Sequence, residues 1–432
     1  MRKTAFVVLF LIFIFSLQAF AEEVSLTLDE AVAIALRDNR DIRLRTEEVK
    51  KAKAKISEAR GALWPSLNFT GGYTYTTGLS EKRIGLTTTQ TTFKYPLFES
   101  GKIVNTIKYN RFNMEATQAV LDKTKLEIIL NLKKAFFTLL LASDYAQLNK
   151  KIVENTQAHL DYLQARYREG EVSESEILNI KDSLASVQQA YETSLNQVEA
   201  SVALLRNILY LDNAVMVKPE ADFSYDQKDI IYDEAFLTAL KKRPEIQQYE
   251  AQRKAAQKGI EITKAGTRPS IYASWSYYSR SASGLFAGDG AITGASSTAT
   301  RAWNDYQTLG FTFSWPVFDG WATRAKVEQA IVELKETQLL KEKTIKDIAL
   351  ELKNAYLDLK NAIVSIRAVE TDAVFYKNNL DVAGKQKDAG IASLLDFDDA
   401  DLKFRVSAFK KDQAVYDYII AKSNFDKAIG GM

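Results

Sequence analysis

The chain has no cysteine and only one histidine in 432 residues. The lack of cysteine excludes a disulfide framework, a thiolate metal site and a lipid anchor on an N-terminal cysteine. His159 has no carboxylate cluster of metal-binding spacing around it, and we interpret it as a solvated helix residue. With so few groups suited to nucleophilic or acid–base work, the sequence predicts no catalytic, cofactor or metal site, and the protein is not expected to be an enzyme.

Long apolar runs are also lacking, because no unbroken run after residue 21 reaches the length of a membrane helix. The first 21 residues combine Arg2 and Lys3, an apolar stretch over 5–15 and an Ala-Phe-Ala ending. This is the layout of a cleavable secretory signal, so we predict a signal peptide over 1–21 and an exported protein. Without those two basic residues, 55 basic side chains face 55 acidic ones, and no nucleic-acid partner is indicated. If the exported chain spans a bilayer, strands must do it.

Glycine and proline are scarce, and they are clustered. Between Gly101 and Gly170 lie 68 residues with neither, and 63 more such residues run from Trp321 to Ala383. A helix of 68 residues is about 100 Å long at 1.5 Å per residue, which exceeds the size of a compact domain. The spacing therefore predicts long helical hairpins that turn near Gly170 and Gly390, where glycine accepts a positive φ.

The sequence repeats itself over most of its length. Asp29-Glu30-Ala31 returns as Asp233-Glu234-Ala235, an offset of 204, and Pro65-Ser66 returns as Pro269-Ser270. Farther on the offset is 220, because Tyr95-Pro96-Leu97-Phe98-Glu99 matches Trp315-Pro316-Val317-Phe318-Asp319. We predict two structural repeats, over residues 22–225 and 226–432, with 16 extra residues in the second strand hairpin. An apolar seam in alternating steps of four and three, typical of a coiled coil, recurs in both: Ile128, Leu132, Ala135, Leu139 and Ala142, then Ile348, Leu352, Ala355, Leu359 and Ala362.

Four segments alternate with the period of two that is typical of strands, in predicted hairpins over 66–98 and 270–318. Each approaches the roughly 9–11 residues that a tilted membrane strand needs. The alternative is a soluble sheet with one wet face, but the export signal and the aromatic-rich face favour a membrane. The predicted aromatic girdle consists of Tyr73, Tyr75, Trp275, Tyr277, Phe311, Phe313 and Trp315.

Four strands cannot form a closed barrel alone, because open edges leave unpaired backbone groups in lipid. Bacterial barrels have an even number of strands, about eight or more, so a shared barrel permits a dimer or a trimer.

These residues resemble the outer membrane efflux protein family of TolC-like channels. The matching features are the Leu26-Thr27-Leu28-Asp29-Glu30-Ala31 opening, Trp64-Pro65-Ser66-Leu67 before the first strand, Tyr95-Pro96-Leu97-Phe98 after the second, and the two turn glycines. The resemblance implies a fold that is mainly α with membrane β: three subunits share a 12-stranded barrel continued by a helical tunnel across the periplasm. It also implies a passive, gated exit duct in the outer membrane of a Gram-negative-type envelope. The implied partners are outer-membrane lipid, a periplasmic adaptor (membrane fusion) protein and an inner-membrane transporter of the RND, ABC or MFS type.

In the family, acidic residues six and nine positions after the second turn glycine form the pore constriction, which maps to Asp396 and Asp399. The alternative for these acids is a solvated helix face. Glu176 occupies the place of an acidic gate latch, although Ala392 and Lys387 depart from the family pattern there. The hairpin-tip residues expected to contact the adaptor are Gly170, Val172, Gly390, Ile391 and Leu394, together with Tyr167.

A second hypothesis is a secreted periplasmic coiled-coil scaffold without a pore. It accounts for the helices but not for four aromatic alternating strands. Within the duct hypothesis, efflux of drugs or metals and type I secretion of proteins are not distinguished, since the transporter selects the cargo.

Overall fold

The computed structural model describes residues 23–76, 84–212, 216–221, 223, 225, 230–283 and 303–431. The predicted signal peptide lies outside these ranges. The chain forms two compact units: a helical unit made of Met1–Thr46, Leu121–Ile246 and Thr344–Met432, and a strand unit made of Glu47–Val120 and Gln247–Lys343.

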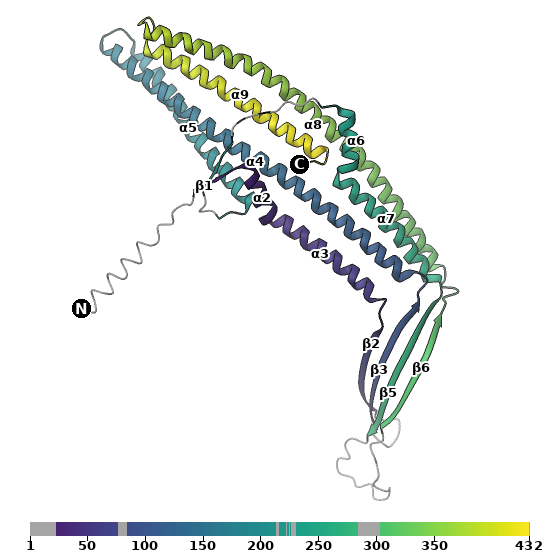
Figure 1. The fold of residues 1–432 in the computed structure, drawn as a ribbon. Helices are drawn as coiled ribbons and strands as arrows, with labels where there is room; N and C mark the ends of the chain where they lie inside the picture. Colours follow the sequence, from purple (N-terminus) through teal and green to yellow (C-terminus); the bar gives the residue numbers. More distant parts are fainter. Residues whose placement is uncertain are drawn as a thin grey trace, which may run out of the picture. The chain divides into compact units, whose positions relative to one another are not determined.

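Four long helices dominate the fold, as the scarcity of glycine and proline predicts. Helices α4 (Lys102–Arg168) and α8 (Ala322–Asp388) have 67 residues each. Their return partners are α5 (Glu174–Leu209) and α9 (Leu394–Ala428) (Figure 1). The long helical hairpins of the predicted fold class are therefore confirmed, and Gly170 and Gly390 have positive φ between the helices of each pair. No helix in the described ranges has both the length and the apolar character that a membrane crossing requires.

The repeated seam forms the core of the helical unit. All ten predicted seam residues are buried, with at most 8% of each exposed. In the second repeat, this seam of α8 packs with Val415, Tyr418 and Phe425 of α9. Full burial of one such large apolar side chain contributes about 1.5–3 kcal/mol, so the two seams account for much of the cohesion of the long helices.

Each repeat begins with a broken pair of helices. Helices α2 (Leu28–Asp38) and α3 (Arg40–Gly61) meet at Asn39, and α6 (Tyr232–Lys242) and α7 (Pro244–Lys264) meet at Arg243. Both junction residues have extended backbone angles and bond the end of a return helix. The Asn39 side chain donates to the carbonyl of Ile208 at 3.2 Å, and Arg243 donates to that of Lys427 at 3.0 Å. The two repeats therefore also share a hydrogen bond from the helix junction to the end of the return helix.

A short parallel pair of strands, β1 (Glu23–Leu26) and β4 (Met216–Pro219), was not predicted from the sequence. Their four-residue length gives too few positions for a period of two to be recognised. Just after β1, Thr27 and Glu30 form a capping box at the start of α2, which explains part of the family-like opening in physical terms.

The strand unit carries one antiparallel sheet in the order β2-β3-β5-β6, and these strands lie side by side in Figure 1. The strands are β2 (Ser66–Thr76), β3 (Ile84–Phe98), β5 (Ser270–Ser283) and β6 (Trp303–Ser314), and the short 3-10 helix η1 (Ala265–Thr267) precedes β5. The alternation of the sequence extends to Val317, but β6 ends at Ser314. By contrast β3, its counterpart in the first repeat, continues to Phe98.

Candidate functional site: the sheet and the hairpin tips

The sheet has one apolar and one polar face, and its pairing register keeps the two apart. One row across the four strands is apolar: Leu67, Phe93, Trp275 and Leu309. The next row, on the opposite face, is polar: Asn68, Thr92, Ser276 and Thr308. Hydrogen bonds cross the polar face between the hydroxyls of Thr92 and Ser276 at 3.2 Å and from the Gln90 amide to the Tyr278 hydroxyl at 3.0 Å. Such a sheet suits an apolar medium on one side and water on the other.

Six of the seven predicted girdle residues lie on the apolar face of the sheet, and the seventh, Trp315, follows the end of β6. Tyr73 and Tyr75 lie toward the β2–β3 connection, whereas Phe311 and Phe313 lie toward the helical end of the strands. The nine residues from Leu67 to Tyr75 are eight steps of ~3.3 Å and so span about 26 Å, close to the ~25 Å apolar band of outer-membrane barrels. Trp315 follows β6, and its indole N–H donates to the carbonyl of Thr267 at 3.1 Å.

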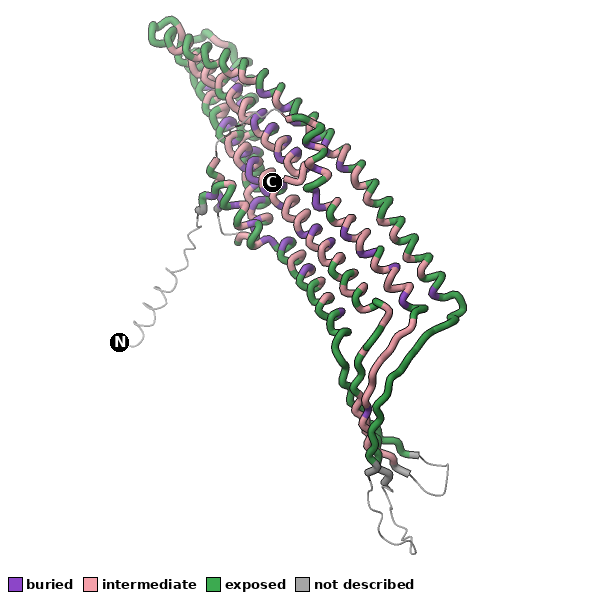
Figure 2. The backbone as a smooth tube through the Cα atoms, turned by 45° about the vertical axis from the view of Figure 1, so that its right-hand side comes forward, coloured by how far each residue is buried: buried purple, intermediate pink, exposed green. Residues whose placement is uncertain are grey.

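The two outer strands of the sheet, β2 and β6, each have only one partner among the described residues. Figure 2 shows both strands exposed, with β3 and β5 partly covered between them. Their free edges present unpaired backbone N–H and C=O groups, which a lipid environment does not tolerate. The sheet of one chain is thus incomplete as a membrane structure.

At the first hairpin tip, Gly170 has φ +77° between α4 and α5. Ser173 caps α5, because its hydroxyl accepts from the backbone N–H of Glu176. The same hydroxyl also lies 3.3 Å from Oε1 of Glu176, the predicted gate-latch residue. Within one chain, the polar contact of Glu176 is therefore with its own helix start.

The second tip repeats this arrangement. Gly390 has φ +72°, and Ser393 caps α9 in a full capping box with Asp396. The Asp396 carboxylate accepts from the Ser393 hydroxyl at 2.7 Å and from its backbone N–H at 2.9 Å. These hydrogen bonds, the hydroxyl first, hold the pKa of Asp396 below its usual value. The Ser-x-x-Glu/Asp pattern after each glycine is a capping signature that sequence reasoning had available and missed.

Asp399, the second predicted constriction residue, connects two long helices. Its Oδ1 lies 2.9 Å from Nε2 of His159, so α9 is bonded to α4 at this level. The interpretation of His159 as a solvated helix residue is therefore wrong. Its side chain is only 25% exposed, and its partner is 240 residues away in the sequence, which no local pattern reveals.

Lys387 and Ala392, which depart from the family pattern, both make contacts within the second hairpin. The Lys387 ammonium lies 4.3 Å from the centroid of the Phe397 ring, within the range of a cation–π contact. The backbone N–H of Ala392 donates to the carbonyl of Gln386 at 3.2 Å. In place of the family's latch residues, this tip thus has a cation–π contact and a backbone bond within its own hairpin.

The apolar side chains of the tips point into solvent in the isolated chain. Ile391 is 78% exposed and Leu394 62%, while Val172 is half-buried.

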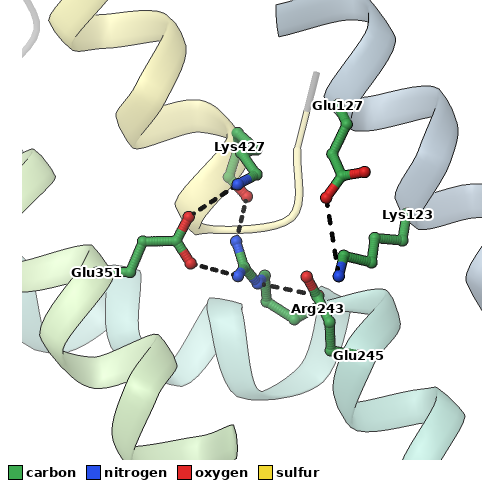
Figure 3. Close-up of polar contacts among 6 residues, drawn as sticks. All are labelled: Lys123, Glu127, Arg243, Glu245, Glu351 and Lys427. Carbon is green, nitrogen blue, oxygen red and sulfur yellow. Dashed lines mark hydrogen bonds and ion pairs between the residues drawn. The ribbon is translucent and has the colours of Figure 1, made fainter.

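A buried charge network near the start of the second repeat was also missed (Figure 3). Arg243 has a 4% exposed side chain and contacts Glu351 of α8 at 2.5 Å and Glu245 of α7 at 3.2 Å. Lys427 of α9 lies 3.0 Å from the same Glu351. Burial raises the pKa of Glu351, but the charge of Arg243 and the hydrogen bond from Lys427 outweigh it, so this pKa is lowered.

A sheet with a lipid-compatible face and a polar face, joined to two copies of a long helical hairpin, defines a channel subunit that crosses its membrane with strands. The chain belongs to the outer membrane efflux protein family, whose model matches residues 31–209 and 237–431. The protein is therefore an outer-membrane channel of the efflux and secretion class, and the predicted family, fold class and location are confirmed.

Its relatives are distant in sequence but match most of their length. Outer membrane protein TolC of Escherichia coli K12 is 24% identical over 406 residues, which cover 90% of this chain and 80% of TolC. The alkaline protease secretion protein AprF of Pseudomonas aeruginosa is 21% identical, over 91% of this chain and 84% of AprF. Among solved structures, the CmeC outer membrane channel of Campylobacter jejuni superposes with a TM-score of 0.75 at 18% identity, covering 94% of this chain and 85% of CmeC. CusC gives 0.74 at 17% identity, covering 97% and 96%.

Proposed function

We propose that three copies of this chain form a passive exit duct of a tripartite efflux or type I secretion system. Each copy contributes four strands to a 12-stranded barrel, and the long hairpins form a tunnel that docks on a periplasmic adaptor and an inner-membrane transporter of the RND, ABC or MFS type. The observation that carries the proposal is the two-faced sheet with two free edges, because only further copies can complete it in lipid. A dimer would close eight strands, so the subunit number is the first quantity to measure.

Helix α8 supports assembly around an axis, because it has two apolar stripes in the helical unit. One stripe is buried, and Leu352, Leu359 and Ile366 are at most 3% exposed. The other is shifted by two residues and exposed: Leu350 is 63% exposed, Leu357 43% and Val364 60%. A heptad stripe left in water is typical of a coiled-coil surface that meets another helix. In the proposed trimer, a long helix of the next subunit covers it.

The gate in this proposal lies at the hairpin tips. Asp396 and Asp399 form the constriction, where three copies place six carboxylates around the axis and favour cations. Glu176 acts as the acidic latch residue. Gly170, Val172, Gly390, Ile391 and Leu394 contact the adaptor, and the exposure of Ile391 and Leu394 supports this assignment.

The test combines cell fractionation, mass and conductance. We expect the protein in the outer-membrane fraction, soluble only with detergent, with a protein mass of three chains by light scattering. In planar bilayers it should form cation-preferring channels of low conductance. A water-soluble monomer without conductance would refute the duct and favour the coiled-coil scaffold, and a mass of two chains would refute the 12-stranded barrel.

A further inference from the structure

The two strand hairpins of the chain have the same pairing register. In the first hairpin Ser66 pairs with Lys94, and in the second Ser270 pairs with Ser314. These pairs are related by the sequence offsets of 204 for the entering strand and 220 for the returning strand. Every residue of β2 therefore has a structural counterpart in β5, and residues 84–94 of β3 have counterparts in β6.

The seam between the two hairpins, where β3 pairs with β5, joins the returning strand of one repeat to the entering strand of the next. Phe93 pairs with Trp275, and Gln90 pairs with Tyr278. A ring of copies needs a second seam of this kind, in which β6 of one chain pairs with β2 of its neighbour. Because the repeats have equivalent strands, the inner seam serves as a template for the outer one.

We propose that β6 pairs with β2 of a second copy of this chain in the register obtained by applying the two offsets to the β3–β5 seam. The inference rests on the proposed ring of subunits and adds its residue-level contact. On the apolar face it pairs Phe311 with Tyr73, Phe313 with Gly71 and Trp315 with Phe69 of the neighbour. On the polar face it pairs Gly310 with Thr74 and Thr312 with Gly72.

The proposed register satisfies conditions that were not used to derive it. It places apolar residues opposite apolar ones and polar opposite polar, whereas a slip by one residue would turn the aromatic residues of β6 to the wet face. It also places the bulky Phe313 and Thr312 opposite Gly71 and Gly72, which have no side chains to crowd them. The strand directions agree as well, because β6 runs antiparallel to the direction of β2 within the sheet.

The early end of β6 has an explanation in this register. In β3, Tyr95, Pro96 and Phe98 pair only with β5, with Leu97 at a register shift between them, because β2 begins opposite Lys94. The equivalent residues 315–318 have no partner within one chain, and β6 stops before them. The neighbour's β2 supplies that partner in the proposed seam, in which Phe318 pairs with Leu67.

The side chains at this end of both edges are exposed and apolar. Val317 is 77% exposed and Phe318 71%. The start of β2 borders a hollow of about 540 Å³ that is lined by Leu63, Trp64, Pro65, Phe93 and Tyr95. The seam brings these two apolar surfaces of neighbouring copies together, and it extends β6 by up to four residues.

The chain has no native cysteine, so the register can be tested by disulfide trapping with no background. Residues directly opposite in an antiparallel pair have Cα atoms about 4.5–5.5 Å apart, which a disulfide can bridge, whereas diagonal neighbours lie about 7–8 Å apart. Four single substitutions suffice: Gly72→Cys, Thr74→Cys, Gly310→Cys and Thr312→Cys. The combinations 74/310 and 72/312 match the proposed register, and the crossed combinations 74/312 and 72/310 match slips of two residues in either direction.

The full-length variants are oxidised in outer membranes and run on denaturing gels without reductant. We expect the two matched combinations to give covalent dimers and trimers, with at least tenfold less product from the crossed combinations. The control Gln90→Cys with Tyr278→Cys occupies the equivalent inner-seam positions and should form a disulfide without any increase in mass.

Two results would overturn the inference. Preferential linking of a crossed combination would show a slipped register, and the absence of links in a protein that is still trimeric by light scattering would show that β6 and β2 do not pair. A ladder that stops at the dimer would refute the three-subunit ring itself, and a detergent-free monomer would refute the proposed function rather than this register. A folding failure of one combination is covered by the other, which uses different residues.

Discussion

Arg243 connects the α6–α7 junction to α8 and α9, and its substitution should increase local opening at the end of α9. Its guanidinium, 4% exposed, pairs with Glu351 and donates to the carbonyl of Lys427 in the last turn of that helix. Removal of one partner of a buried ion pair costs about 3–5 kcal/mol, because the other charge is left without compensation. Glu351 retains Lys427 and is 37% exposed, which lowers the expectation to about 2–3 kcal/mol.

The assay for Arg243→Met is local hydrogen exchange in the detergent-solubilised protein. Every ~1.4 kcal/mol is a factor of ten in the opening equilibrium, so exchange at residues 421–428 should increase roughly 30- to 150-fold. The matched control is Lys123→Ala, drawn in the same view (Figure 3): its contact with Glu127 is 3.7 Å long and exposed, and should contribute less than about 1 kcal/mol. Equal exchange in the two variants, or no change for Arg243→Met, would refute the reasoning.

Three further predictions concern the tips and the helices of the strand unit. Asp399→Asn should reduce the preference for cations in reversal-potential measurements more than Asp398→Asn does, and an equal effect would remove Asp399 from the constriction. Glu176→Lys should raise the closed-state conductance of single channels in planar bilayers. The control Glu174→Lys, also in the first turn of α5, should leave this conductance unchanged. An unchanged conductance of Glu176→Lys would argue against the latch. Hydrogen bonds from Arg253 and then Lys341 lower the pKa of Glu250 to about 2. These bonds favour the ionised carboxylate, so Glu250 contributes to the free energy of unfolding only while it is ionised. Its contribution is complete above about pH 4.5 and is lost as the pH falls toward 2. The difference in melting temperature between the wild type and Glu250→Gln should therefore shrink between pH 6 and pH 2.5, and a constant difference would contradict the assignment.

The capping boxes separate two roles of the same acids. Asp396 completes the N-cap of α9, and an N-cap contributes about 1 kcal/mol to helix stability. Asparagine still accepts the hydrogen bond from the Ser393 hydroxyl, so a change in conductance with Asp396→Asn but not with Ser393→Ala would indicate a role of Asp396 in the pore. A change that both variants show would indicate a role in the N-cap of α9.

Much of this protein follows from local sequence patterns. The stretches without glycine and proline predicted α4 and most of α8, because none of their residues strongly disfavours a helix, and α8 then continues through Gly384 to Asp388. The ten-residue seam predicted the core, since a four-three spacing places side chains on one face of a helix. The period of two predicted both faces of the sheet, because successive strand residues point in opposite directions.

Other features depended on tertiary structure, because their partners are distant in the chain. His159 and Asp399 are 240 residues apart, and Arg243 and Glu351 are 108 apart, so only the packing of α4, α8 and α9 brings these groups together. The end of β6 at Ser314 depends on which strand lies beside it, although the alternation of the sequence continues to Val317. Periodicity determines which side of an element is apolar, but the identity of the opposing side chain is determined only when distant segments pack, since contact energies act through space and not along the chain.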